Sequence, residues 1–362
     1  MMSSWKQRLL RAAWATGLFR WMRFRHRHEL LVLTYHSVVK GVREPRRHYP
    51  LVYRNAVDAN RFKRQMRYLQ THYRLLTGDE FRAVLDGASP PDRAVVVTFD
   101  DGLLNNKTVA LPILHRLEIP AVFFLPTGFI DTASEGELRR HWTEDLIARL
   151  SLQQAQDTFD PTLLNALLPG LAIDLSTYAP SEAILRVVDH LKALPRSQRT
   201  ARLSTLTANL GNPLSPSALP ADPDGHSILA TMTWNDARTA ANHGVALGGH
   251  TVNHESLARL PDDRAAAEIN DSLAAIADRT DEPADLFSYP YGTAQDFDDR
   301  HKTMLSEAGC RGAFTQQVGF NDETTDPLAL HRIDVSPNYD LGTFAYVVSG
   351  TKHPVDRLVR RR

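Results

Sequence analysis

The apolar segments of this chain are short and uninterrupted, and this feature most constrains its fold. Residues 94–99, 120–126 and 245–249 are apolar on both faces rather than alternating, and amphipathic stretches such as residues 262–280 lie between such segments. Strands that are buried on both faces are typical of parallel sheets covered by helices. The sequence therefore predicts an α/β protein with a parallel sheet, either a barrel or a doubly wound sheet.

Residues 143–230 interrupt this order of strands and helices. They are rich in Leu, Ala, Ser and Pro and contain helical stretches, so we predict a mainly helical insertion there. The insertion divides a catalytic domain formed by residues 31–142 and 231–350. Residues 1–30 form a basic, aromatic N-terminal segment, and residues 351–362 form a basic C-terminal tail.

Charge is unevenly distributed along the chain, although the formal net charge is zero. Residues 1–30 hold seven Lys and Arg against the single acid Glu29, so the remaining body is acidic, which disfavours general nucleic-acid binding. The first 30 residues also hold three of the five tryptophans. This composition favours either a helix packed on the body or a peripheral contact with a membrane surface.

The sequence also predicts where the protein works. No apolar run reaches the about 18 residues of a membrane span, and the N-terminus lacks the pattern of a secretory signal. The single cysteine, Cys310, excludes a disulfide within the chain and a thiolate metal cluster. We expect a cytoplasmic protein; under the membrane alternative, residues 1–30 are the segment that contacts the inner face of the cytoplasmic membrane.

Two pairs of polar residues follow apolar strands, at the strand ends where parallel α/β folds place their sites. Asp100 and Asp101 follow residues 94–99, and His250 and His254 follow residues 245–249. Either pair alone is more often a turn cap or a surface pair. Together, two imidazoles and one carboxylate suit a divalent metal with open coordination positions. Zn²⁺ is the first expectation, with Co²⁺, Ni²⁺, Fe²⁺ or Mn²⁺ as alternatives, and the second carboxylate is then free to act as a base.

A third motif, Leu-Phe-Ser-Tyr-Pro-Tyr-Gly, occupies residues 286–292. Pro290 holds the preceding residue in an extended conformation and fixes the approach of Tyr291. A rigid turn of this kind can aim a backbone N–H at a developing oxyanion, although on its own the motif is typical of an ordinary strand end.

The motifs Thr-Phe-Asp-Asp-Gly, His-Thr-Val-Asn-His and Tyr-Pro-Tyr-Gly, in this order, resemble those of the metal-dependent polysaccharide deacetylases of carbohydrate esterase family 4. The resemblance is to the bacterial exopolysaccharide-associated branch and covers roughly residues 30–142 and 231–350, including His-Trp-Thr-Glu-Asp-Leu at 141–146. It implies a distorted (β/α)7 barrel of parallel strands with a helical insertion. It also implies a hydrolase that acts on a carbon–nitrogen bond of a carbohydrate.

The resemblance implies a role for each matched residue. Asp101, His250 and His254 bind the metal, Asp100 is the general base, and the backbone N–H of Tyr291 helps to hold the oxyanion. The late histidine that serves as general acid in the family corresponds to His331. Thr251 orients the site, and His36, at the end of an early strand, is either structural or lines the substrate site.

One position departs from the family pattern. Many members hold the base with an Arg two residues before the Pro of the third motif, where this chain has Ser288. We expect Arg332, on the late strand, to be the substitute.

We expect removal of an N-acetyl or other N-acyl group from an amino sugar in a polysaccharide or lipid-linked glycan precursor. Two alternatives stay open: an amide hydrolase for a non-sugar substrate, and an inactive glycan-binding module. The discriminating feature is the pocket lining, because sugars require stacking aromatics and several hydroxyl partners. A glycosidase is disfavoured, because adjacent carboxylates cannot readily flank a bond from about 5–9 Å apart.

Overall fold

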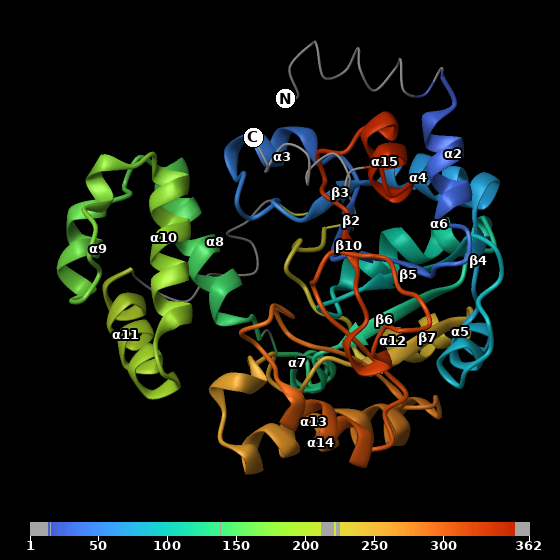
Figure 1. Ribbon diagram of the computed structural model, residues 1–362. Coiled ribbons are helices and arrows are strands. Elements are labelled where there is room, and N and C mark those ends of the chain that lie inside the picture. Colours follow the sequence, from blue (N-terminus) through green and yellow to red (C-terminus); the bar gives the residue numbers. More distant parts are fainter. Residues whose placement is uncertain (1–13, 15, 138, 211–220, 222–224, 352–362) are drawn as a thin grey trace.

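A curled sheet of parallel strands forms the centre of the structure, a computed structural model that describes residues 14, 16–137, 139–210, 221 and 225–351 (Figure 1). The strand order is β10-β1-β5-β6-β7-β8-β9, with β4 beside β5, and every pairing is parallel. The strands of this sheet are β1 (Leu31–Tyr35), β4 (Arg74–Leu75), β5 (Ala94–Phe99), β6 (Ala121–Leu125), β7 (Val245–Gly249), β8 (Leu286–Ser288), β9 (Gly312–Phe314) and β10 (Ile333–Asp334). The predicted distorted (β/α)7 barrel is confirmed, as a half-barrel whose curled sheet is surrounded by helices.

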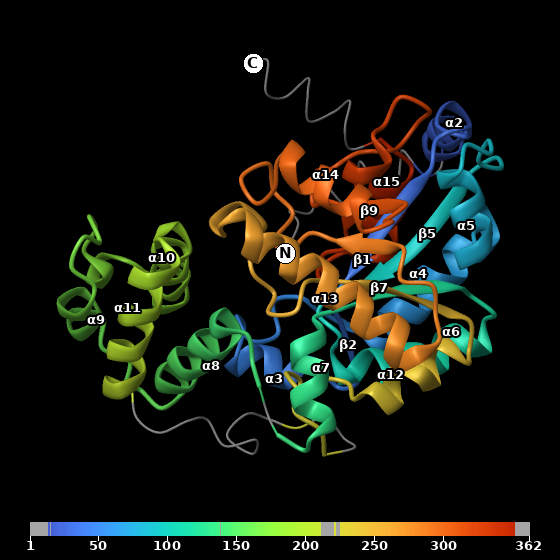
Figure 2. The same ribbon diagram turned by 90° about the horizontal axis from the view of Figure 1, so that it is seen from below.

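Helices pack around the sheet because its strands are apolar on both faces (Figures 1 and 2). In β5, Val95, Val97 and Phe99 belong to one buried cluster, and Ala94 and Val96 belong to a second. The helices outside the insertion are α2 (Leu18–Arg25), α3 (Arg43–His48), α4 (Ala59–His72), α5 (Gly78–Leu85), α6 (Leu111–Arg116), α7 (Thr127–Ser134), α12 (Trp234–Ala241), α13 (Asp262–Thr280), α14 (Asp299–Glu307) and α15 (Leu341–Val348).

Four helices between β6 and β7 form a separate lobe beside the barrel. They are α8 (Trp142–Ala155), α9 (Pro161–Leu167), α10 (Pro180–Ala193) and α11 (Arg196–Asn209). In both views they lie on one side of the barrel (Figures 1 and 2). The lobe has its own apolar cluster, which extends to the loop region around the short strands β2 (Ser37–Val39) and β3 (Ala56–Asp58). It therefore covers the side of the barrel where the chain leaves β1.

The last strand of the sheet, β10, is only two residues long. Residues Pro327–Ala329 form a 3₁₀ turn that Asp326 caps, and only Ile333 and Asp334 pair with β1. Since the proline begins a turn, the apolar residues after it pack without extending the strand. The consequence for the site is that Arg332 and His331 lie immediately before the sheet.

The basic N-terminal segment is described from residue 14 onward. Its helix α2 buries Phe19 and Met22, and Phe19 lies against Tyr346 of α15. Residues 1–13, 15, 138, 211–220, 222–224 and 352–362 lie outside the described residues. Among the helices that are described, none is both long and apolar enough to cross a membrane.

Candidate metal and catalytic site

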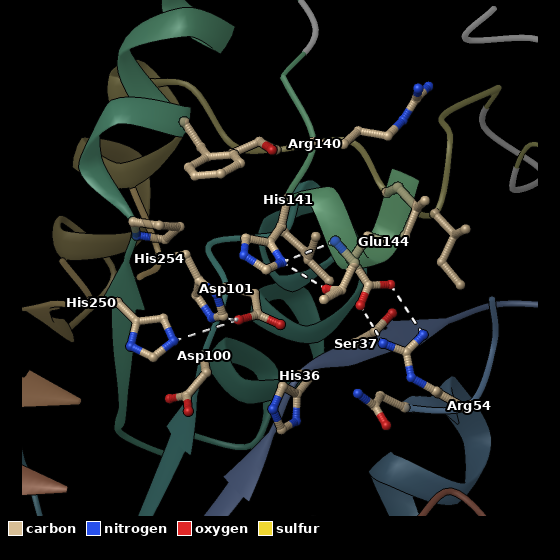
Figure 3. Close-up of a pocket in the computed structure, with 18 of the residues that line it drawn as sticks. His36, Ser37, Arg54, Asp100, Asp101, Arg140, His141, Glu144, His250 and His254 are labelled. Atoms are coloured by element: carbon tan, nitrogen blue, oxygen red, sulfur yellow. Dashed lines mark hydrogen bonds and ion pairs between the residues drawn. The ribbon is translucent and has the colours of Figure 1, made fainter. Parts of the chain in front are cut away.

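Three predicted metal ligands converge because neighbouring parallel strands end at the same edge of the sheet. β5 leads into Asp101, and β7 leads into His250 and His254. One potential ligand atom from each of the three lies within 4.8 Å of the others. Figure 3 shows Asp101, His250 and His254 pointing toward one another.

The backbone at these positions is unusual. Asp101, Thr251, His254 and Tyr291 all have positive φ angles, between 54° and 73°, a region that residues other than glycine rarely adopt. Such conformations cost free energy and persist where the surrounding structure holds them, often at functional sites. The sharp turns that they make direct side chains from separate strand ends into one space.

The ligand set fits a divalent metal such as Zn²⁺. His250 donates its Nδ1–H to the carbonyl of Ser288 at 2.7 Å, which leaves Nε2 with a lone pair toward Asp101. The Nε2 atoms of His250 and His254 lie 3.6 and 3.2 Å from Asp101 Oδ1. A backbone carbonyl behind a ligating imidazole fixes its tautomer, as is usual for metal-binding histidines. Two imidazoles and one carboxylate leave coordination positions open, the arrangement of catalytic rather than structural zinc sites.

Asp101 is ionised in this environment. Burial raises its pKa, but the neighbouring imidazoles of His250, His254 and His36 outweigh burial and hold the pKa well below its usual range. An anionic oxygen is the ligand that a hard or borderline cation requires.

Asp100 faces a different partner. Arg332, fully buried, donates from Nη1 and Nη2 to the two carboxylate oxygens of Asp100, each at 2.8 Å. Burial by itself raises the pKa of Asp100. The neighbouring Arg332 and His250 lower this pKa by more than burial raises it, so the net pKa is below the usual value. Asp100 is therefore an anion at neutral pH, and its Oδ1, to which only Arg332 donates among the described residues, keeps a second lone pair for another donor.

Arg332 itself is held in place by the strand ends around it. Its Nε donates to the carbonyl of Thr315 at 2.7 Å, and its Nη2 also donates to Ser288 Oγ at 3.0 Å. Ser288 Oγ in turn donates to Asp100 Oδ2 at 3.2 Å. This chain thus has Ser288 at the position where many family members have an arginine. Arg332, just before β10, instead donates to the carboxylate of Asp100.

His331 does not join the site. It is absent from the residues that line the cavity described below, and its ring lies over Gly319. Neighbouring residues in extended backbone point to opposite sides, so the geometry that directs Arg332 toward Asp100 directs His331 away. The predicted general-acid role of His331 is therefore replaced by another assignment below. Among the described residues, the buried hydroxyl of Thr251 has no hydrogen-bond partner, so an orienting role for Thr251 does not act through a hydrogen bond of this hydroxyl.

A cavity of 470 Å³ opens in front of the two carboxylates. It is lined by the barrel and by the insertion together, as Figure 3 shows for Arg54, His141 and Glu144. The aromatic and polar side chains that line it include Phe129, Tyr291, Asn55, Arg54, Thr143, Glu144, Lys192 and Gln316.

His141 lies between the insertion and the catalytic edge, and sequence reasoning did not single it out. Its Nε2 is 3.2 Å from the hydroxyl of Tyr291, and its Nδ1 accepts from the N–H of Thr143 at the start of α8. Burial lowers the pKa of His141 well below its usual value, and His254 lowers it further. The ring is neutral, so His141 caps the first helix of the insertion and holds Tyr291. The signal for it was the His-Trp-Thr-Glu-Asp-Leu stretch.

His36 lines the same cavity as Asp100 and Asp101. It follows β1, and its Nδ1 lies 3.7 Å from Asp334 Oδ1. Burial lowers the pKa of His36, but the carboxylates of Asp101, Asp334 and Asp100 outweigh burial, and the net pKa is raised. Of the two interpretations that the sequence left open, the lining position is the one that the structure shows.

Comparison with known proteins relates parts of this chain to polysaccharide deacetylases. The polysaccharide deacetylase family model matches residues 87–153 and 223–313. A putative polysaccharide deacetylase of Bacillus subtilis, YxkH, is 26% identical over 119 residues, which are 33% of this chain. The match covers 42% of that relative, so this chain spans about two fifths of its length.

Two solved structures share the fold. The Streptococcus pyogenes deacetylase PplD, in complex with acetate, has a TM-score of 0.57 at 16% identity, over 89% of this chain and 99% of PplD. IcaB from Ammonifex degensii has a TM-score of 0.53 at 18% identity, over 89% of this chain and 97% of IcaB.

Proposed function

We propose that the protein is a metal-dependent deacetylase that removes an N-acyl group from an amino sugar, since the polysaccharide deacetylase family model matches residues 87–153 and 223–313. The observation that carries the proposal is the division of labour between two adjacent carboxylates. Asp101 faces two histidines, whereas Asp100 faces a buried arginine. One carboxylate is thus placed to hold a cation and the other to accept a proton beside it.

Asp101, His250 and His254 would hold the metal. A divalent cation bound there acts as a Lewis acid that polarises the acyl carbonyl and lowers the pKa of water. Asp100, kept anionic and fixed by Arg332, takes the proton of the attacking water as general base. Since Arg332 occupies one lone pair on each oxygen, the carboxylate cannot rotate away from the cavity.

Tyr291 supports the developing negative charge. Among the described residues, no acceptor pairs with its backbone N–H, which belongs to a turn of positive φ at the cavity wall. A preorganised N–H of this kind stabilises a tetrahedral oxyanion without reorganisation. The bond between the Tyr291 hydroxyl and His141 fixes the same residue from its other end.

His36 is the candidate general acid. It lies in the cavity, is oriented by Asp334, and has a pKa raised by the surrounding carboxylates. A protonated imidazole donates the proton that the departing amine requires. His36, which follows the first strand, thus takes the general-acid role that the sequence had assigned to His331 beside the last strand.

The lining of the cavity supports a sugar rather than a simple amide. Phe129 and Tyr291 offer apolar ring surface, and Asn55, Thr143 and Gln316 offer hydrogen-bonding groups for hydroxyls. Two alternatives differ from the proposal in their expected turnover. A non-sugar amide hydrolase would hydrolyse amides without a sugar, and an inactive glycan-binding module would hydrolyse nothing.

Acetate release from a panel of substrates tests the function. We expect hydrolysis of N-acetylated amino-sugar oligomers, loss of activity with a chelator, and recovery on adding Zn²⁺ or Co²⁺. An N-acetylated peptide without sugar should be a poor substrate. Equal turnover of the peptide would favour the amide hydrolase, and binding of the glycans without acetate release from any metal-loaded sample would favour the inactive module.

Replacing His36 by Gln tests its role as the acid. Because the wild-type residue must be protonated, kcat/KM should fall as pH rises through the pKa of His36, which lies above the usual histidine value. His36→Gln should lose about 10²–10⁴-fold in rate and also lose this alkaline limb. The matched control is His243→Gln, an exposed histidine just after the C-terminal end of α12 whose loss should leave the profile unchanged. An unaltered alkaline limb in His36→Gln would remove His36 from the role.

A further inference from the structure

The N-terminal helix α2 has one buried face and one exposed apolar face. Phe19 and Met22 are buried, whereas Leu18, Trp21 and Phe24 are 37%, 58% and 61% exposed. Trp14, just before the helix, is 45% exposed. Four of the seven large apolar side chains that are exposed in the described chain therefore fall within residues 14–24. We call these four residues the aromatic patch.

Exposed apolar patches of this kind usually mark a site of interaction. Single exposed apolar residues are ordinary, but a contiguous group that contains two tryptophans and a phenylalanine indicates a contact with something else. The helix does not need these side chains for its own packing, because Phe19 and Met22 already anchor it to the body. Trp14 also lies against Tyr68, and Arg27 lies over the ring of Phe24, but both aromatic side chains keep about half of their surface exposed.

Cations surround the aromatic patch. Arg20 and Arg25 are exposed on α2, and Arg64 and Arg67 are exposed on α4. The two helices are neighbours, since Arg23 of α2 donates to the hydroxyl of Tyr68 on α4 at 2.7 Å, and Trp14 contacts the same ring. In the described chain no carboxylate pairs within 4 Å with any of these four exposed arginines, and the first acid of the sequence is Glu29.

We propose that the aromatic patch and its arginines dock on the surface of an anionic lipid membrane. Tryptophan and phenylalanine enter the interface between headgroups and acyl chains, and arginines bind the negative lipid headgroups. A second copy of this chain is the less suitable occupant, because a symmetric contact through this face would bring like charges together. An anionic membrane supplies an apolar phase for the aromatic patch and negative charges for its arginines.

Vesicle sedimentation tests the proposal without depending on catalysis. The full-length protein is mixed with phosphatidylcholine vesicles, with or without phosphatidylglycerol. We expect it to sediment with the anionic vesicles, to bind neutral vesicles more weakly, and to be released as salt screens the arginines. The double variant Trp21→Ser/Phe24→Ser should bind at least about tenfold more weakly.

The control is Leu163→Ser/Leu185→Ser, which removes two exposed leucines from the insertion and should bind like the wild type. All of these side chains are exposed, so the thermal midpoints of both double variants should match that of the wild type. A third variant, Arg64→Gln/Arg67→Gln, should lose part of the preference for anionic lipid but keep the contact with neutral vesicles.

Three results would overturn the proposal. One is wild-type protein that stays in the supernatant with anionic vesicles at low salt. Another is equal binding by the Trp21→Ser/Phe24→Ser variant and the wild type. The third is a dimer in solution that this variant dissociates while vesicle binding is absent, which would make the patch a contact between copies of the chain. Since no outcome involves acetate release, failure here is distinct from failure of the proposed deacetylase.

Discussion

Asp100→Asn is expected to leave a folded, metal-binding protein that has lost about 10²–10⁴-fold in kcat. The amide is nearly isosteric with the carboxylate, so the cavity keeps its shape. It is not a base at neutral pH, and its NH₂ group faces the guanidinium of Arg332, where a second acceptor oxygen stood before. The loss should therefore appear in kcat rather than in the metal content. Steady-state acetate release at saturating metal measures it.

Ser288→Ala is the matched control for this variant. It removes the weaker hydrogen bond to Asp100, at 3.2 Å, and leaves the two bonds from Arg332 in place. We expect a modest effect, because the base stays ionised and fixed. Wild-type turnover by Asp100→Asn would exclude Asp100 as the base, and an equally large loss in Ser288→Ala would show that the serine is the essential tether.

Arg332→Met is expected to be the most destabilising single change in the site. The substitution leaves the anion of Asp100 buried without its partner, and removal of one partner of a buried pair costs about 3–5 kcal/mol of unfolding free energy. Activity should fall with it, because the base is no longer fixed. Urea unfolding followed by circular dichroism measures the stability.

A double-mutant cycle separates the pair from the rest of the packing. Arg332→Met combined with Asp100→Asn should be more stable than Arg332→Met alone, since the buried charge is gone. Arg332→Lys should recover little, because an ammonium cannot donate to both carboxylate oxygens in the fork geometry of a guanidinium. If the two single changes were simply additive, Arg332 would act as a packing residue and not as the partner of Asp100.

The sequence was sufficient for the sheet and for the cluster of Asp101, His250 and His254. Residues 94–99 and 245–249 are strands as predicted, and polar residues directly after parallel strands meet at one edge of a sheet whatever the loops do. That rule holds for Asp100, Asp101 and His250, which follow their strands without a gap.

Assignment of the late residues required the three-dimensional structure. At residues 331 and 332, one step along an extended chain exchanges the inward and outward side chains, and the shortness of β10 left the register undetermined from the pattern. Arg332 was expected to substitute for the missing arginine, and it donates to both carboxylate oxygens of Asp100. His331, chosen because it was the only late histidine that fitted the family pattern, faces away.

The positions of His36 and His141 in the site also could not be predicted from the sequence. His36 ends the first strand, and only its pairing with β5 and β10 places it opposite Asp100 and Asp101. His141 reaches Tyr291 across 150 positions of sequence. Contacts between residues so far apart in the sequence depend on how the insertion packs on the barrel. The periodicity of one segment gives no information about this packing.

The central claim is that two adjacent carboxylates have different tasks, and metal content measured in Asp101→Asn beside Asp100→Asn tests it most directly. Both proteins would be stripped with a chelator, reloaded with Zn²⁺, freed of excess metal and analysed by mass spectrometry. The account predicts about one bound ion per chain in the wild type and Asp100→Asn, and almost none in Asp101→Asn. Equal metal in the two variants would contradict it.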